Sequence, residues 1–201
     1  MPPGSRWIKT WKTPTFVPFG AKNRQNAGDA DLAAYVVDRG KAGIQIVVDV
    51  TDDLPVPTAV RAPARKFIRS DHLEIWWRPY GASTNKQLGI GLLGDGTADV
   101  RWLLPSEASE GTPVVRRTGT HFEVDLSLAT LGLEQSMAPP SSEMSVDLTV
   151  AFSDADDASA GQQTVVATSP VRWNRQETFG RLIWLSSKAR RFPSFASRLS
   201  P

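Results

Sequence analysis

The chain has 201 residues, 40% of them hydrophobic and 22% charged, which is the composition of one domain with a buried core. Its formal net charge of +2 is too small to indicate a nucleic-acid partner, and the absence of cysteine excludes disulfides, thiolate metal ligands and a cysteine nucleophile. No apolar run approaches the ~18 residues of a transmembrane helix, and residues 1–12 lack the apolar region of a signal peptide, so we expect neither.

Basic residues gather at both ends of the chain. The first 25 residues contain five lysines and arginines and no acid, and residues 187–201 contain four and again no acid. We expect an extended basic lead-in at 1–29 with room for an edge strand, a ligand-binding β-domain at 30–186, and a basic tail at 187–201. Solvated termini are the simplest interpretation of the two basic ends, and contact with phosphate or anionic lipid is the alternative.

The first predicted strands form a hairpin. Two apolar runs, 31–38 and 43–51, are separated by the short turn-forming stretch 39–42. In the second run Ile44, Ile46, Val48 and Val50 share one face and Gln45, Asp49 and Thr51 lie on the other, as expected of a strand whose successive side chains point to opposite faces.

The rest of the chain also consists mainly of short predicted strands. A long proline-containing connection precedes more short runs with period-two alternation, and one helical turn at 127–132 ends at a glycine. The predicted later strands are 72–78, 87–93, 98–104, 113–117, 121–128, 144–152, 164–167 and 181–185. No long amphipathic helix is indicated, so the sequence predicts an all-β sandwich or barrel.

Classical catalytic arrangements are not indicated. Only two histidines, His72 and His121, could act as a base, and both fall inside predicted strands. No serine stands in a nucleophile-elbow sequence, and no glycine-rich phosphate loop precedes a helix. A glycosidase would need two carboxylates across a cleft, and four acids on predicted strands could share one sheet face: Glu74, Glu123, Asp125 and Asp147. Because polar residues alternate along any half-solvated strand, we expect no catalytic residue and no enzyme.

Aspartates gather where two predicted strands end. Asp52 and Asp53 close one strand, and Asp154, Asp156 and Asp157 close another. Clustered carboxylates on loops suit calcium, a hard cation that prefers several oxygen ligands. The spacing lacks the glycine and terminal glutamate of an EF-hand loop, and aspartates also cap turns through their own hydrogen bonds. These five residues are the candidate ligands of a structural calcium ion.

Two of the seven tryptophans are candidate ligand contacts. Trp77 is in phase with the apolar residues of its strand, whereas Trp76 points to the opposite face, and Trp173 lies in a polar stretch. An exposed indole beside polar donors is a common way to hold a sugar ring. The candidate ligand-binding residues are Trp76, Trp173, Glu74, Arg78, Glu123 and Arg175. Packing beneath the long loops is the alternative for both tryptophans.

Six segments, in order, resemble those of family 9 carbohydrate-binding modules and their DOMON-like relatives. They are QIVVDVTDD (45–53), SDHLEIWW (70–77), TGTHFEVDL (118–126), LGL (131–133), DLTVAFSDAD (147–156) and TFGRL (178–182). The resemblance covers roughly residues 30–186. It implies an immunoglobulin-like or jelly-roll β-sandwich of two antiparallel sheets that binds a saccharide or polysaccharide, sometimes with structural calcium and sometimes as an appendage of a secreted enzyme.

The resemblance also implies an extracellular or periplasmic location. Some relatives bind haem through a methionine and a histidine, and neither His72 nor His121 is obviously placed to meet Met137 or Met144 here. The leading hypothesis is therefore a non-catalytic carbohydrate-binding module. The alternatives are a structural or protein-interaction domain without a sugar ligand and, last, a glycan-active enzyme.

Overall fold

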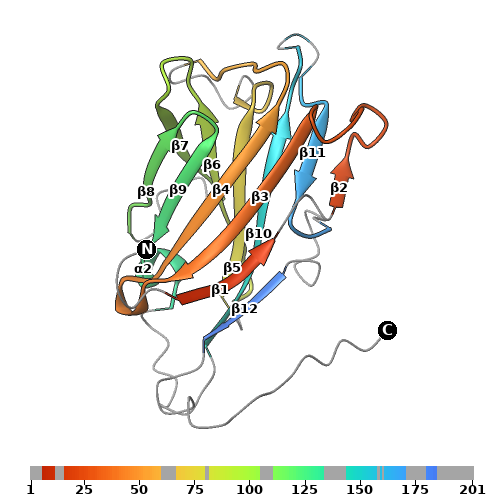
Figure 1. The fold of residues 1–201 in the computed structure, drawn as a ribbon. Helices are drawn as coiled ribbons and strands as arrows, with labels where there is room; N and C mark the ends of the chain where they lie inside the picture. The colour runs from red at the N-terminus through yellow and green to blue at the C-terminus, as the bar shows by residue number, and fades with distance from the viewer. Residues whose placement is uncertain are drawn as a thin grey trace, which may run out of the picture.

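The protein folds into two antiparallel sheets that pack face to face (Figure 1). The computed structural model describes residues 6–11, 16–59, 67–79, 82–104, 111–133, 144–157, 159, 161–170 and 180–184. Every ladder between its strands is antiparallel. The prediction of an all-β sandwich is confirmed.

The first sheet, called sheet A, has five strands in the order β1-β3-β4-β9-β8. Their bounds are β1 Arg6–Trp11, β3 Ala30–Asp38, β4 Ile44–Asp52, β9 His121–Leu126 and β8 Val114–Thr118. The short 3-10 helix η1 (Gly40–Ala42) connects β3 to β4. This is the hairpin that the two apolar runs predicted.

The second sheet, called sheet B, follows the order β2-β11-β10-β5-β6-β7, and β12 also pairs with β10. Their bounds are β2 Phe16–Phe19, β11 Thr164–Ala167, β10 Met144–Asp154, β5 His72–Pro79, β6 Lys86–Leu92, β7 Ala98–Leu104 and β12 Gly180–Trp184. The predicted lead-in thus contains one strand of each sheet, β1 and β2. The predicted tail at 187–201 lies outside the described residues.

The core fills the space between the sheets with the inward residues of each strand. Ile44, Ile46 and Val48 from sheet A face Leu73, Ile75 and Trp77 from sheet B, and all six side chains are buried. The Trp77 ring lies 5.5 Å from that of Trp102. The period-two alternation therefore predicted the buried face correctly, because a strand exposes every second side chain to the same side.

A single helical turn, α2 (Leu128–Leu131), follows β9 at the end of the sandwich where η1 also lies. The Ser127 side chain accepts a hydrogen bond from the Thr130 amide, which caps the helix N-terminus. Gly132 ends the helix with φ of 76°, a conformation that favours glycine. No helix in the described part of the chain is long and apolar enough to cross a membrane.

Candidate metal centre and the covered face of sheet B

Five aspartates converge at the end of the sandwich opposite α2. Asp29 precedes β3, Asp52 ends β4, Asp71 precedes β5, Asp154 ends β10 and Asp156 follows it. Their carboxylate oxygens form two groups in which the atoms lie within 4.8 Å of one another. The first group is Asp29, Asp154 and Asp156, and the second is Asp52, Asp71 and Asp154. We call these five residues the aspartate cluster.

The register of two antiparallel pairs brings these residues together. In sheet A, Ala30 lies opposite Asp52, so the start of β3 meets the end of β4. In sheet B, His72 lies opposite Ser153, so the start of β5 meets the end of β10. Because both meeting points lie at the same end of the sandwich, acids from both sheets share one site.

Asp154 is the most unusual member of the cluster. Its side chain is 0% exposed, and neither carboxylate oxygen has a hydrogen-bond partner. Burial, followed by the negative charge of Asp156, raises the pKa of Asp154 to about 7. Asp156 contributes a third such atom, because its buried Oδ1 also lacks a partner. Buried polar atoms normally have partners, so these oxygens are candidate ligands of a cation.

The other members are held by backbone amides. The two oxygens of Asp71 accept from the amides of Val56 and Ala155, the latter at 2.9 Å. Burial, followed by the charge of Asp52, nevertheless raises the pKa of Asp71 to about 8. Asp52 accepts from the Leu54 amide at 3.0 Å, and burial raises its pKa too. These bonds fix the direction of the carboxylates, as metal ligands require.

The chemistry of the cluster suits a hard divalent cation. Within the described residues, no lysine, arginine or histidine forms an ion pair with any of its five carboxylates. Calcium takes oxygen ligands at about 2.3–2.6 Å, so oxygens within 4.8 Å of one another can contact one ion. The residues therefore fit the calcium that the sequence predicted.

Three of the five predicted metal ligands belong to the cluster, namely Asp52, Asp154 and Asp156. Asp53 lies close enough for its charge to raise the pKa of Asp154 but is in neither group. Asp157 instead holds its own turn, with Oδ1 accepting from the Ser159 amide and Oδ2 from the Ser159 hydroxyl, both at 2.7 Å. This is the turn-capping alternative that the sequence left open.

Sequence reasoning missed Asp29 and Asp71. Asp29 could have been found, since the predicted hairpin places the start of its first strand beside the end of its second. Asp71 depends on the pairing of β5 with β10, which are far apart in the chain. No local sequence pattern predicts the pairing of β5 with β10.

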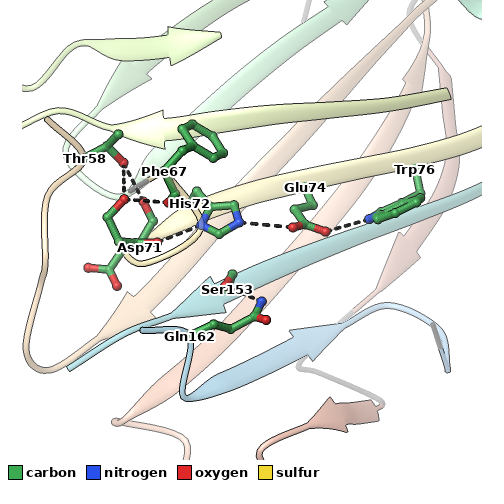
Figure 2. Close-up of polar contacts among 9 residues, drawn as sticks. Thr58, Phe67, Asp71, His72, Glu74, Trp76, Ser153 and Gln162 are labelled. Atoms are coloured by element: carbon green, nitrogen blue, oxygen red, sulfur yellow. Dashed lines mark hydrogen bonds and ion pairs between the residues drawn. The ribbon is translucent and has the colours of Figure 1, made fainter. Parts of the chain in front are cut away.

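A buried polar chain occupies the outer face of sheet B, where Figure 2 shows His72, Glu74 and Trp76 in a row. The Trp76 indole donates to Glu74 Oε2 at 2.8 Å, and His72 Nε2 lies 3.1 Å from Glu74 Oε1. His72 Nδ1 lies 2.7 Å from the carbonyl of Ser70 and must donate to it, because a carbonyl oxygen only accepts. A second proton must then lie between Nε2 and Oε1, on either residue. Both oxygens of Glu74 are therefore engaged within the protein.

The connection between β4 and β5 covers part of this face (Figure 2). The fully buried Phe67 ring lies 4.8 Å from the His72 ring. The Arg101 guanidinium lies 4.9 Å from the centre of the Phe67 ring. Phe67 rests on two glycines of β6: a Cβ atom at Gly89 would come within 2.8 Å of the ring, and one at Gly91 within 2.9 Å. The absence of a side chain at these two glycines makes room for Phe67.

Trp76 is not open to solvent. It is 4% exposed and packs with Ala151, Val165 and Ala167 on the outer face of sheet B, opposite to Trp77 in the core. The expected orientation of the two tryptophans is correct, and of the two alternatives for Trp76 the structure has packing rather than exposure. A sugar ring could stack on Trp76 only after its covering residues moved.

Among the described candidate ligand-binding residues, Glu74, Trp76 and Arg78 lie at alternate positions of β5, whereas Glu123 lies on β9 in the other sheet. Glu74 and Arg78 lie on sheet B, where Arg78 pairs with Asp147 at 3.2 Å. Glu123 lies on the outer face of sheet A and pairs with Arg116 at 3.4 Å. Trp173 and Arg175 fall outside the described residues.

The four acids that could have shared one sheet face are divided between two faces. Glu74 and Asp147 lie on sheet B, whereas Glu123 and Asp125 lie on sheet A, and both of the latter contact Arg116. The possibility of one face shared by all four acids is therefore not realised, because the alternation of polar residues gives the phase of a strand but not its sheet.

The histidines are also engaged. His72 is buried with contacts at both ring nitrogens, and the exposed His121 lies 2.7 Å from Asp49. Met137, one of the two methionines considered for haem, lies outside the described residues.

Neither the search against protein-family models nor the search of curated proteins finds a match to this chain.

Proposed function

We propose that the protein is a non-catalytic binding domain that holds a divalent cation, calcium, in its aspartate cluster. The single observation that carries this proposal is the carboxylate of Asp154, which is fully buried among other acids with no hydrogen-bond donor on either oxygen. An unpaired buried charge is strongly destabilising, and a cation would turn the same group into a stabilising ligand.

The donor set favours calcium over other common metals. Every side chain of the cluster offers oxygen, and zinc sites usually contain histidine or cysteine. Magnesium demands near-ideal octahedral geometry and keeps several of its waters, whereas calcium accepts six to eight oxygens in flexible geometry. A group of buried and half-buried carboxylates from four separate segments of the chain matches the flexible geometry of calcium.

The proposed absence of catalysis is supported by the state of the best acid–base candidates. Glu74 is bonded through both oxygens to His72 and Trp76, and it is 5% exposed. A general acid or base must reach the substrate proton within hydrogen-bond distance, directly or through a water. Glu74 would have to leave its present partners to do so.

Thermal unfolding of the chelated protein, with and without calcium, tests the proposal. An ion present at 100 times its Kd stabilises the folded state by about 2.7 kcal/mol, which is about 5–10 °C for a domain of this size. We expect calcium to raise Tm by this order, and magnesium to raise it less. An unchanged Tm over a range of calcium concentrations would contradict the proposal.

Two variants make the test specific. Asp154→Asn should abolish the calcium response and raise Tm in chelator, because it removes a buried charge without changing the size of the side chain. The matched control is Asp157→Asn, which keeps an acceptor for the Ser159 amide outside the cluster and should respond to calcium as the wild type does.

We propose a saccharide as the ligand class, and this part rests on the resemblance of the strand motifs alone. The remaining candidate contacts for the saccharide are Trp173 and Arg175. A glycan array, run in calcium and in chelator, should give a saccharide signal that Trp173→Ala removes. A blank array with folded, calcium-loaded protein would instead favour the protein-interaction alternative.

A further inference from the structure

We infer that the aspartate cluster takes two divalent cations, with the carboxylate of Asp154 bridging them. This inference rests on the proposed function, and it adds a second site and assigns the ligands of each. The first cation would contact Asp29, Asp154 and Asp156, and the second would contact Asp52, Asp71 and Asp154.

The grouping of the oxygen atoms is the first support. Each group of three brings its ligand atoms within 4.8 Å of one another, and the groups share Asp154 and no other residue. A single compact site would join all five side chains in one group. The observed division instead has one shared carboxylate between two pairs of acids.

The bonding state of Asp154 is the second and independent support. Both of its oxygens lack a hydrogen-bond partner and the side chain is 0% exposed, so both oxygens are available to cations. Asp156, whose buried Oδ1 also lacks a partner, is a member of the first group. In the second group the orientation of Asp71 is fixed by two backbone amides.

Charge balance favours two ions over one. The five carboxylates carry five negative charges when ionised, so one divalent cation would leave three of them uncompensated. Two cations would leave one. Because uncompensated charge is costly in a buried site, the second ion stabilises an arrangement that the first cannot balance alone.

Each proposed cation would connect the two sheets. Asp29 and Asp52 come from the strand ends of sheet A, whereas Asp71, Asp154 and Asp156 come from those of sheet B. Both groups contain members of each set. The pair of ions would therefore join the sheets at an end of the sandwich that carries five acids.

The test is the number of calcium ions bound by the full chain, measured by isothermal titration with calcium chloride after chelation and by native mass spectrometry. Two ions per chain is the expected result. One ion would overturn this inference while leaving the proposed function intact, and no bound ion would overturn both.

Single substitutions test the assignment of ligands. Asp29→Asn should leave only the second site, Asp52→Asn should leave only the first, and Asp154→Asn should lose both. Asp157→Asn is the control and should still bind two ions. If Asp29→Asn and Asp52→Asn each abolished all binding, or each still bound two ions, the division into two sites would be wrong. Circular dichroism in chelator checks that each variant is folded, and the wild-type stoichiometry stands without any variant.

Discussion

At the scale of single residues, protonation and cation binding compete for the same carboxylates. Asp154 and Asp71 have pKa values of about 7 and about 8, raised first by burial and then by neighbouring acids. An aspartate in the unfolded chain titrates near 3.9. In the absence of a cation the folded protein therefore holds protons that the unfolded chain releases.

The sign of the pH dependence follows from these shifts. Without a cation, the stability that comes from the two protonated side chains is complete below about pH 4 and is lost as the pH rises through 7 and 8. Bound calcium requires the carboxylates to be ionised, so its affinity increases over the same range. We expect the gap in Tm between the calcium-loaded and chelated protein to widen from about pH 5 to about pH 8.

Measurement of Tm across that range, in calcium and in chelator, checks the expectation. Asp154→Asn serves as the comparison, because it removes one of the two titrating groups and should flatten the decline of the chelated protein. A gap that stayed constant with pH would mean that the carboxylates are already ionised before calcium binds.

At the scale of elements, the connection between β4 and β5 links the aspartate cluster to the covered face of sheet B. Val56 donates its amide to Asp71, and Thr58 bonds to the hydroxyl of Ser70 at 2.8 Å. Farther along the same connection, Phe67 rests on Gly89 and Gly91. One segment thus orients a proposed metal ligand and packs against His72, the first member of the polar chain.

Adding a methyl group beneath this connection should loosen it. In Gly91→Ala the new Cβ would lie 2.8 Å from Thr58 Oγ1 and 2.9 Å from the Phe67 ring. We expect the free energy of unfolding to fall by about 1–3 kcal/mol, since overpacking outweighs the backbone entropy that alanine would save. Chemical denaturation measures this change.

The control for this substitution is Gly94→Ala. The nearest atoms to its new Cβ are those of Pro57 at 3.8 Å, an ordinary contact distance, so its stability should change little. If Gly91→Ala proved as stable as wild type, Phe67 would have to pack more loosely on β6 than the structure shows.

At the scale of the whole molecule, the two ends of the sandwich are built differently. The end with η1 and α2 is closed by backbone and capping hydrogen bonds, such as the one from the Thr130 amide to Ser127. The other end brings together five acids from both sheets. The second end therefore needs a positive charge that the described side chains do not supply.

This asymmetry predicts where calcium will slow hydrogen exchange. The amides of Gln25, Leu54, Val56 and Ala155 bond to carboxylates of the cluster, so calcium should slow their exchange strongly. Amides in η1 and α2 should be affected only through the overall gain in stability. Exchange followed by mass spectrometry, with and without calcium, distinguishes the two ends. Equal slowing at both ends would argue for a purely global effect.

Local features of the sequence determined the elements and their buried faces. Alternation in runs such as 43–51 predicted both the strand and its inward residues, because the geometry of a strand repeats every two residues. The glycine at 132 likewise predicted where the helical turn α2 ends. The acids at the ends of β4 and β10 led to the hypothesis of a metal site, because within each strand end they are close neighbours in the chain.

The tertiary structure decided which of these features meet. Asp71 joins Asp154 only because β5 pairs with β10, and Trp76 is buried because of its packing on the outer face of sheet B. Glu74 and Glu123 both alternate with apolar residues in a predicted strand, yet they lie on different sheets. Alternation fixes the phase of a strand, but the neighbours of that strand depend on contacts between distant parts of the chain, which no local pattern encodes.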